Sequence, residues 1–327
     1  MPERVRITDV SPRDGLQNEP GVISTADKVR LADLLIRSRV DEIEVSSFVS
    51  PKWVPQLGDG PEVFTALGKV HRYGGWGVRA GVWSALVPNQ KGMGAALEVS
   101  RAAGTQLVDK VAVFTAASET FSRRNTNASI AETIERFKPV AATALDAGLE
   151  VRGYISCAIA CPFEGPIDAA RVADVAMQLL DIRVEDIDFG DTIGAGTPES
   201  VTRMLNVFTT RFQQRPMPAL APRMTLHLHD TFGRAADCVK AALDMGIRSF
   251  DGSVAGLGGC PYASTPGKRA PGNISTELLV RTVHDAGYET GVDLDALARA
   301  ADFARQIVAK SREEASRSGA ENAGRTK

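Results

Sequence analysis

A pair of histidines constrains this chain more than any other feature of its sequence. His227 and His229 lie in the largely apolar run MTLHLHD (residues 224–230), whose length and composition predict a buried β-strand. Side chains two positions apart on a strand point to the same face, so both imidazoles would lie together. Burying two unpartnered imidazoles costs free energy. A shared metal ion would satisfy both rings, and a hydrogen-bonded pair of core histidines is the alternative.

Short strand-like runs alternate along the chain with amphipathic helical stretches. The expected strands cover residues 5–10, 42–48, 79–86, 110–115, 150–157, 186–191, 223–230 and 249–255. Thr25 is expected to cap a helix that runs to Arg37. This alternation predicts βαβ units and a parallel sheet. Eight such units close naturally into an α/β fold of the (β/α)₈ TIM-barrel type.

A doubly wound open sheet is the competing architecture. Such a sheet usually begins with a glycine-rich phosphate loop after its first strand. Here the first strand is followed by SPRDG (residues 11–15), which lacks that pattern. We therefore expect a TIM-barrel catalytic domain over residues 1–300, with extra helices at 276–287 and 294–308. Residues 301–327 are expected to form a C-terminal helix and a charged tail.

Composition narrows the class of protein. A hydrophobic fraction of 43%, a charged fraction of 24% and a net charge of −2 are typical of a globular protein and argue against nucleic acid as a partner. The sequence has no apolar run long enough to cross a membrane. Four cysteines in a chain without a secretory signal indicate reduced thiols and a cytoplasmic location.

Polar residues recur where the expected strands end, which is where barrels build their active sites. Asp14 follows the first strand, so its carboxylate would meet His227 and His229. One carboxylate and two imidazoles, completed by an amide oxygen such as that of Asn273, suit a Lewis-acid metal. These ligand types leave Zn²⁺, Mg²⁺ and Mn²⁺ open. The alternative for Asp14 is a surface turn, because Asp-Gly is common in turns.

Three further residues are candidates for chemistry. The guanidinium of Arg13 suits a carbonyl oxygen that becomes an enolate, or it is merely an ion-pair partner of Asp14. Glu44 would either hold Arg13 in place or be a satisfied interior acid. Cys260 ends a glycine-rich loop that starts at Gly256 and would move a proton on loop closure, or it is a small buried hydrophobe. Without a Schiff-base lysine or a nucleophile elbow, metal-dependent carbon–carbon chemistry is favoured.

These segments resemble the 3-hydroxy-3-methylglutaryl-CoA (HMG-CoA) lyase family. The resemblance is carried by VSPRDGLQNE (10–19), EVSSFVSPKWVPQ (44–56) and SVAGLGGCPY (253–262), with shorter matches at RGY (152–154), GDTIG (190–194) and HLHDT (227–231). It extends from about residue 5 to about residue 300. The glycine-rich segment is specific for the lyases, whereas Arg-Asp-Gly and the paired histidines are shared with isopropylmalate and homocitrate synthases.

The resemblance implies a reaction and a set of roles. HMG-CoA would be cleaved to acetyl-CoA and acetoacetate, as in leucine degradation and ketone-body metabolism, with Mg²⁺ or Mn²⁺ as the cofactor. The partner is a small acyl-CoA substrate, and a homo-oligomer, a dimer or larger, is expected. The implied metal ligands are Asp14, His227, His229 and Asn273; the implied catalytic residues are Arg13, Asp14, Cys260, Glu44 and Asp191; the implied substrate contacts are Arg13, Gln17, Ser47 and Glu277. Asp14 is also a candidate for the base.

Two departures from the family pattern bear on the substrate. Twelve residues separate Cys260 from Asn273, where the family usually has eight, and Pro20 stands where many members have lysine. We therefore predict a possible preference for a related 3-hydroxyacyl-CoA. A Claisen-condensing synthase is one rival, although those enzymes are usually longer. A non-catalytic barrel is the other, although it would be expected to have lost Arg13 or a metal ligand.

Overall fold

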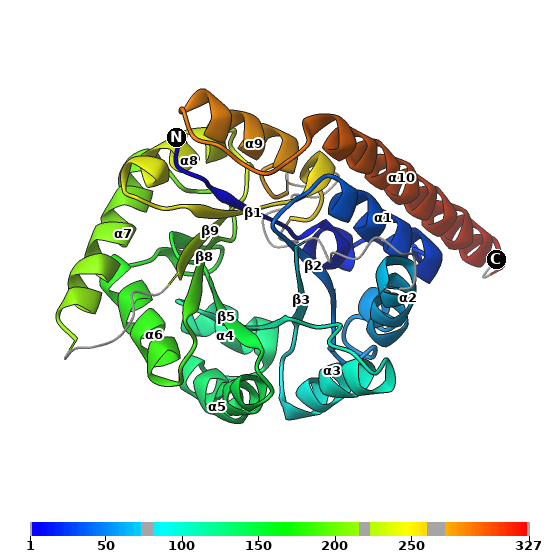
Figure 1. The fold of residues 1–327 in the computed structure, drawn as a ribbon, viewed down its shortest axis with the longest axis horizontal. Coiled ribbons are helices and arrows are strands. Elements are labelled where there is room, and N and C mark those ends of the chain that lie inside the picture. Colours follow the sequence, from blue (N-terminus) through cyan, green and yellow to red (C-terminus); the bar gives the residue numbers. More distant parts are fainter. Residues whose placement is uncertain (1, 73–80, 216–222, 260–271, 326–327) are drawn as a thin grey trace.

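The computed structural model describes residues 2–72, 81–215, 223–259 and 272–325, with only the backbone for Arg72 and residues 318–325. Its centre is a closed parallel barrel with the strand order β1-β10-β9-β8-β5-β4-β3-β2 (Figure 1). The predicted (β/α)₈ architecture is thereby confirmed. The barrel strands are β1 (Arg6–Asp9), β2 (Glu42–Ser47), β3 (Val82–Leu86), β4 (Lys110–Ala116), β5 (Glu150–Ser156), β8 (Asp186–Asp191), β9 (Arg223–Leu228) and β10 (Ser249–Gly252).

Helices form a ring outside the barrel (Figure 1). They are α1 (Thr25–Arg37), α2 (Gly60–Arg72), α3 (Gln90–Ala102), α4 (Glu119–Thr126), α5 (Ile130–Asp146), α6 (Ala169–Asp181), α7 (Pro198–Gln213), α8 (Ala235–Asp244), α9 (Thr276–Asp285) and α10 (Leu294–Arg325). A short antiparallel hairpin of β6 (Ala160–Cys161) and β7 (Gly165–Pro166) follows β5. Ser24 caps α1 by accepting the N–H of Asp27, so the prediction that Thr25 is the cap was wrong.

The strands present alternate side chains to the helices and to the barrel interior, as a closed sheet requires. On β4, Val111 and Val113 belong to the hydrophobic core that also contains the helices. Lys110 points the other way, because its Nζ lies 2.7 Å from Glu42 Oε2 on β2 and 3.0 Å from Asp186 Oδ2 on β8. The same strand therefore stabilises the outer core and fills the interior.

The lower interior is filled by paired charges. Arg152 on β5 is buried, and its guanidinium lies 3.2 Å from Asp186, 3.5 Å from Asp188 and 3.0 Å from Asp251. Together with Lys110 these residues close the floor beneath the mouth of the barrel. Buried charges are tolerated only when they are paired and hydrogen-bonded, so this floor depends on each partner.

Two strands end at least two residues earlier than the sequence predicted. β9 ends at Leu228, and His229 instead forms an isolated bridge with Asn273. After β10 the chain enters a short 3-10 turn, η3 (Val254–Gly256), in which Ala255 has φ 59°. A positive φ at alanine breaks the extended strand geometry. The chain beyond β10 therefore turns across the barrel mouth.

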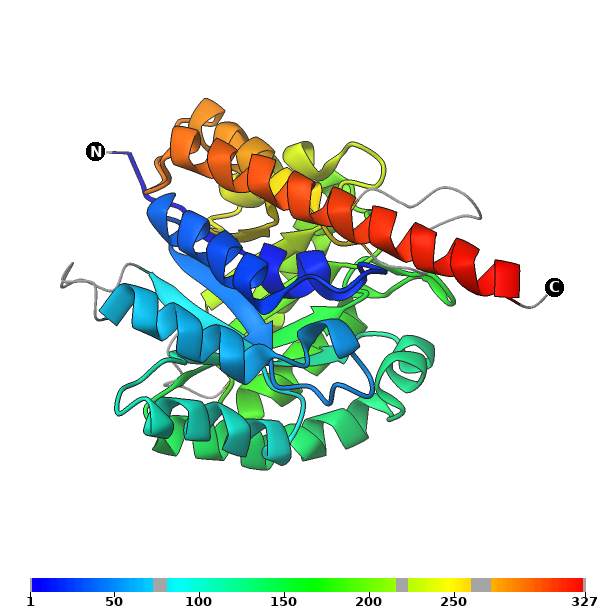
Figure 2. The same cartoon turned by 90° about the vertical axis from the view of Figure 1, so that its right-hand side faces the viewer.

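The last helix is longer than the sequence predicted. α10 lies along α1 and extends past its end (Figures 1 and 2). Ser311 accepts the N–H of Gly21 at 3.1 Å and donates its hydroxyl to the Gly21 carbonyl at 2.8 Å. Arg312 forms two hydrogen bonds with the carboxylate of Glu19, at 2.8 and 2.9 Å. These contacts attach α10 to the segment that follows Asp14 and explain why the helix continues beyond residue 308.

A search of the described residues for a helix with the length and hydropathy of a membrane span finds none.

Replacing Lys110 with methionine is expected to destabilise the barrel by about 3–5 kcal/mol, because Glu42 and Asp186 would lose a buried cation. The free energy of unfolding, measured by urea titration, checks this. Lys138→Met is the matched control, since Lys138 is half-exposed and pairs only with the exposed Glu135; its cost should stay below about 1 kcal/mol. Equal losses in the two variants would contradict the role assigned to the interior charges.

Candidate active site

A turn at the end of β1 places Asp14 over the barrel mouth. In η1 (Ser11–Gly15), the N–H groups of Arg13, Asp14 and Gly15 all point to the carbonyl of Val10, at 3.2, 2.8 and 3.1 Å. Turns of this wide, π-type geometry are rare and frequently occur at functional sites. The turn projects the side chains of Arg13 and Asp14 side by side toward the interior.

Asp9 links this turn to the chain that follows β10, the last strand of the barrel. Its buried carboxylate accepts hydrogen bonds from the Ser11 hydroxyl at 2.5 Å and N–H at 2.9 Å, from the Thr276 hydroxyl at 2.6 Å, and from the N–H of Val254 at 3.1 Å. Burial raises the pKa of Asp9 to about 6, although these hydrogen bonds oppose the rise. Asp9 therefore joins the turn that carries Asp14 to α9 and to the segment after β10.

The structure brings three of the predicted ligands together as a possible metal site. One ligand atom from each of Asp14, His227 and His229 lies within 4.8 Å of the other two. Burial alone would raise the pKa of Asp14, but Arg13 and the two imidazoles lower it to about 2, so the carboxylate is ionised at neutral pH. An ionised carboxylate opposed to two imidazoles fits a divalent cation.

The two imidazoles differ in their surroundings. His227 Nδ1 lies 3.3 Å from Asp251 Oδ2, which leaves Nε2 for a metal. The Nδ1 atom of His229 is buried and has no hydrogen-bond partner among the described residues. Burial and the neighbouring His227 lower the pKa of His229 to about 4, so this ring is neutral and its lone pair is available. A buried imidazole nitrogen without a hydrogen-bond partner, beside a carboxylate, fits a metal ligand.

Asp251 and Asp188 support His227 from below, and the sequence reasoning assigned neither of them a role. Burial and the neighbouring Asp251 raise the pKa of Asp188, whereas Arg152 and His227 overcome the effect of burial and lower that of Asp251. The rise favours the protonated form of Asp188, and the fall favours an ionised Asp251, which contacts His227 and orients it. Strand alternation is the sequence signal that could have identified Asp251 as an interior residue, because it lies two positions from Ser249 and Ser253, which also face inward.

Asn273 reaches the site through its amide nitrogen. Nδ2 donates to Asp14 Oδ2 at 2.8 Å and to the Leu257 carbonyl at 2.9 Å. Ligation of a metal by this side chain would require its carboxamide to rotate, so the ligand role of Asn273 stays a prediction. Gly258 permits the close approach. It has φ 99°, and a β-carbon there would lie 2.6 Å from Asn273 Nδ2 and 3.0 Å from Asp14 Oδ2.

Arg13 lies between two acids and an aromatic ring. Its Nε donates to Glu44 Oε2 at 2.6 Å and its Nη1 to Asp14 Oδ1 at 2.8 Å. Its guanidinium carbon lies 5.4 Å from the centroid of the Tyr154 ring. Burial would lower the pKa of Arg13, but Glu44 and Asp14 raise it, so the cation persists. The contact with Glu44 matches the sequence-based proposal that this acid holds Arg13 in place.

The other predicted substrate contacts occupy different positions around the mouth. A bulge between Glu44 and Ser46 shifts the alternation of β2. Ser46 then faces α2, since its Oγ would lie 3.2 Å from a β-carbon on Gly60, and Ser47 faces inward. The Ser47 hydroxyl is buried without a hydrogen-bond partner among the described residues, which leaves it free to bind a ligand. Gln17 is half-buried just after η1.

Two predicted residues instead hold loops in the structure. Asp191 accepts the N–H groups of Ala195 at 3.0 Å and Gly196 at 2.7 Å, and burial raises its pKa to about 6 despite these bonds. Glu277 accepts the N–H of Ala255 at 3.1 Å and pairs with Arg305 at 3.3 Å. These contacts are with loop backbone and with Arg305, so the catalytic role of Asp191 and the substrate role of Glu277 stay predictions. Cys260 lies outside the described residues.

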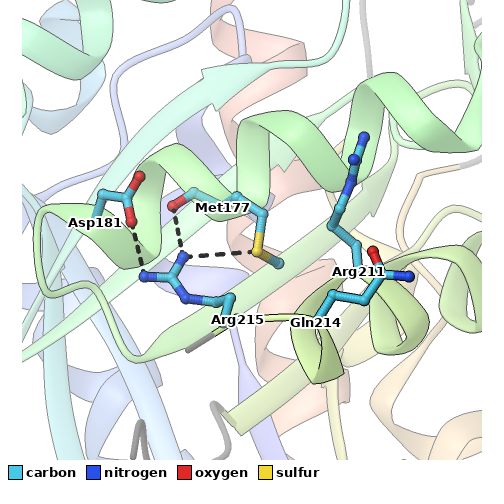
Figure 3. A pocket seen from close by; sticks show the side chains of 5 residues that line it. All are labelled: Met177, Asp181, Arg211, Gln214 and Arg215. Carbon is cyan, nitrogen blue, oxygen red and sulfur yellow. Dashed lines mark hydrogen bonds and ion pairs between the residues drawn. The ribbon is translucent and has the colours of Figure 1, made fainter. Parts of the chain in front are cut away.

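A separate hollow of about 490 Å³ lies on the outside of the barrel between α6 and α7 (Figure 3). Its arginines are already paired, since Arg215 lies 2.7 Å from Asp181 and Arg211 lies 2.6 Å from Asp174. Met177 completes the wall with Gln214. These side chains offer no grouping of imidazoles, thiols and carboxylates comparable to the barrel mouth. The chemistry therefore belongs to the mouth.

Removal of one imidazole is expected to weaken metal binding without unfolding the chain. We expect His229→Ala to lower Mn²⁺ affinity by at least about tenfold, measured by calorimetry on the metal-free protein. His284→Ala is the control, because His284 lies on α9 and bonds only the Thr290 hydroxyl at 2.9 Å among the described residues. Affinity should rise with pH, because His227, whose pKa is raised, must lose its proton to bind. Unchanged affinity in His229→Ala would remove the ring from the ligand set.

Comparisons with known proteins agree with this geometry. The family model described as HMGL-like matches residues 4–304. The chain is 43% identical over 308 residues to the human mitochondrial hydroxymethylglutaryl-CoA lyase, covering 94% of this chain and 87% of that protein. It is 43% identical over 312 residues to a Pseudomonas aeruginosa protein named 3-hydroxy-3-isohexenylglutaryl-CoA/hydroxy-methylglutaryl-CoA lyase, covering 95% of each.

Solved structures give the same result. The hydroxymethylglutaryl-CoA lyase of P. aeruginosa aligns with a TM-score of 0.82 and 41% identity, covering 98% of this chain and 99% of that one. The HMG-CoA lyase of Brucella melitensis aligns with a TM-score of 0.80 and 42% identity, covering 93% and 99%. The barrel mouth of this chain also carries a possible site for the metal on which the family depends. The chain therefore belongs to the HMGL-like family, as a carbon–carbon lyase of the HMG-CoA lyase type.

Proposed function

We propose that this protein cleaves HMG-CoA to acetyl-CoA and acetoacetate with Mg²⁺ or Mn²⁺. The observation that carries the proposal is the placement of Arg13 beside the triad of Asp14, His227 and His229 at the mouth of the barrel. A cation site next to a fixed guanidinium suits a reaction that turns a hydroxyl into a carbonyl and a thioester into its enolate. The relatives named as lyases of this substrate add support.

Asp14, His227 and His229 would hold the metal, and Asn273 would join them after rotation of its carboxamide. When bound, a divalent cation supplies Lewis-acid polarisation of the substrate oxygens. Asp251 fixes the orientation of His227 through its contact with Nδ1. In this proposal the substrate's C3 hydroxyl lies close to the Asp14 carboxylate and its thioester lies near Arg13.

Cleavage begins when the C3 hydroxyl gives up its proton. The C2–C3 bond then breaks, its electrons move to the thioester as an enolate, and C3 becomes the ketone of acetoacetate. Protonation of the enolate at C2 completes acetyl-CoA. Arg13 stabilises the enolate oxygen, because its guanidinium is held in place by Glu44 and remains charged.

The two proton transfers need a base and an acid. Asp14 is ionised, and it accepts a proton from the hydroxyl in this proposal, although its pKa of about 2 makes it a weak base. The pKa of Tyr154 is raised by burial and by Glu44, so its hydroxyl stays protonated. We assign proton delivery to the enolate to Cys260, on the family resemblance.

The remaining assignments complete the proposal. Asp191 would position the substrate through the loop it holds, and Gln17, Ser47 and Glu277 would bind it at the rim. The buried Ser47 hydroxyl supports this most directly. The thiols of Cys161 and Cys238 form no disulfide among the described residues, which supports a reducing, cytoplasmic location. A role in leucine breakdown and a homo-oligomeric state follow from the family resemblance.

The purified protein is expected to release acetoacetate from HMG-CoA, with activity lost after EDTA treatment and restored by Mg²⁺ or Mn²⁺. Acetoacetate and acetyl-CoA are measured separately, and equal amounts are expected because one bond is broken. Isopropylmalate-type condensation is tested in the same metal-loaded sample with acetyl-CoA and a 2-oxo acid. Cleavage that is indifferent to metal, or condensation without cleavage, would refute the proposal.

Replacing Glu44 with glutamine is expected to lower kcat for HMG-CoA about 100-fold while changing KM little. The amide keeps the shape of the side chain but loses the charge that orients Arg13, which acts on the transition state. Asp33→Asn is the control, because Asp33 contacts Arg30 and Arg37 on α1, on the outside of the barrel. If Glu44→Gln raised KM and left kcat unchanged, Arg13 would act in substrate binding alone.

A further inference from the structure

The upper interior of the barrel has two chemically different halves. The side toward β8, β9, β10, β1 and β2 carries the charged and metal-binding groups described above. The side formed by β3, β4 and β5 carries a small, separate apolar cluster made of Leu86, Ala112 and Tyr154, with Phe114 packed against it. Alternation places these residues inside, because their neighbours Ala85, Val111, Val113 and Ile155 belong to the outer core.

Tyr154 joins the two halves. Its hydroxyl lies 3.3 Å from Glu44 Oε2 and 3.4 Å from Asp251 Oδ2. The ring centroids of Tyr154 and His227 lie 6.1 Å apart, and the Arg13 guanidinium lies 5.4 Å from the Tyr154 ring. The apolar cluster therefore begins directly beside the groups that would hold the reacting atoms.

Phe114 is the member that faces open space. Its side chain points into the barrel, yet it is partly exposed, whereas Leu86 and Ala112 are buried. Its ring packs against the cluster, and its centroid lies 6.5 Å from that of Phe137 on α5. Solvent that reaches an inward-facing ring enters through the mouth, where a substrate would also enter.

We propose that Phe114, with Ala112 and Leu86, receives the alkyl branch on C3 of the substrate and determines how long that branch can be. This inference rests on the proposed lyase function. C3 bears four groups. Three of them are the hydroxyl, the arm that ends in the carboxylate and the arm that ends in the thioester, and these suit the polar half. The fourth is a hydrocarbon, and it is most favourably placed against the apolar half. Phe114 is the partly exposed member of the cluster, so its ring is the surface that the branch would meet.

The test compares kcat/KM for HMG-CoA with that for 3-hydroxy-3-isohexenylglutaryl-CoA, the longer-branched ester in the name of the Pseudomonas relative. Phe114→Ala is expected to raise the ratio of kcat/KM for the longer ester to kcat/KM for HMG-CoA by at least about tenfold. Hydrophobic pockets discriminate by about that factor per methylene. Phe114→Leu should give a smaller change in the same direction. Ala112→Val should lower this ratio, because kcat/KM for the longer ester should fall more than kcat/KM for HMG-CoA.

Val113→Ala is the matched control. Val113 lies on the same strand between the two test positions, is buried, and faces the outer core. It should lower the melting temperature without changing the ratio. The inference is overturned if the wild type cleaves HMG-CoA but the ratio is the same in all variants, or if Val113→Ala shifts it as much as Phe114→Ala. If the wild type cleaves neither ester, the proposed function fails and this inference fails with it.

Discussion

Pairing of the first strand with the last is the constraint on which the site depends. The hydrogen bonds between β1 and β10 close the sheet, with Arg6 beside Ser249 and Asp9 beside Gly252. β10 pairs in turn with β9, so closure brings the turn after β1 next to the strand that carries His227. Without closure, Asp14 and the imidazoles would lie at opposite edges of a sheet. The proximity of these three side chains is therefore a product of barrel topology, and Asp9 reinforces it with a hydrogen bond from the N–H of Val254 after β10.

Charge is layered along the barrel axis. The floor holds Lys110 and Arg152 among acids that neutralise them, and the mouth holds Arg13 among Glu44 and Asp14. Asp251 belongs to both layers, because it pairs with Arg152 below and contacts His227 above. Low dielectric strengthens each of these interactions and makes each unpaired member costly. The floor therefore does more than fill space, since it orients one of the imidazoles that would bind metal.

Much of the fold could be predicted because strands and helices leave local periodic signals. The barrel class and the approximate position of every strand followed from apolar runs between helical stretches. The ends of the elements were harder to predict. The segment after β10 is apolar, which is typical of a strand, yet the chain turns at Ala255. It turns there because the carboxylates of Asp9 and Glu277 accept hydrogen bonds from the backbone. The length of α10 was also missed, since a charged helix gains its stability from distant partners such as Glu19.

The sequence by itself determined which chemical groups are available, through the paired histidines, the Arg-Asp-Gly turn and their agreement with a known family. Only the tertiary structure decided how these groups are arranged. It showed that Asn273 presents its nitrogen to Asp14, that Asp191 binds its own loop, and that Asp251 lies behind His227. The physical reason is that residue type and period are local properties of the chain. Hydrogen-bond direction, burial and pKa depend on residues brought together across the barrel.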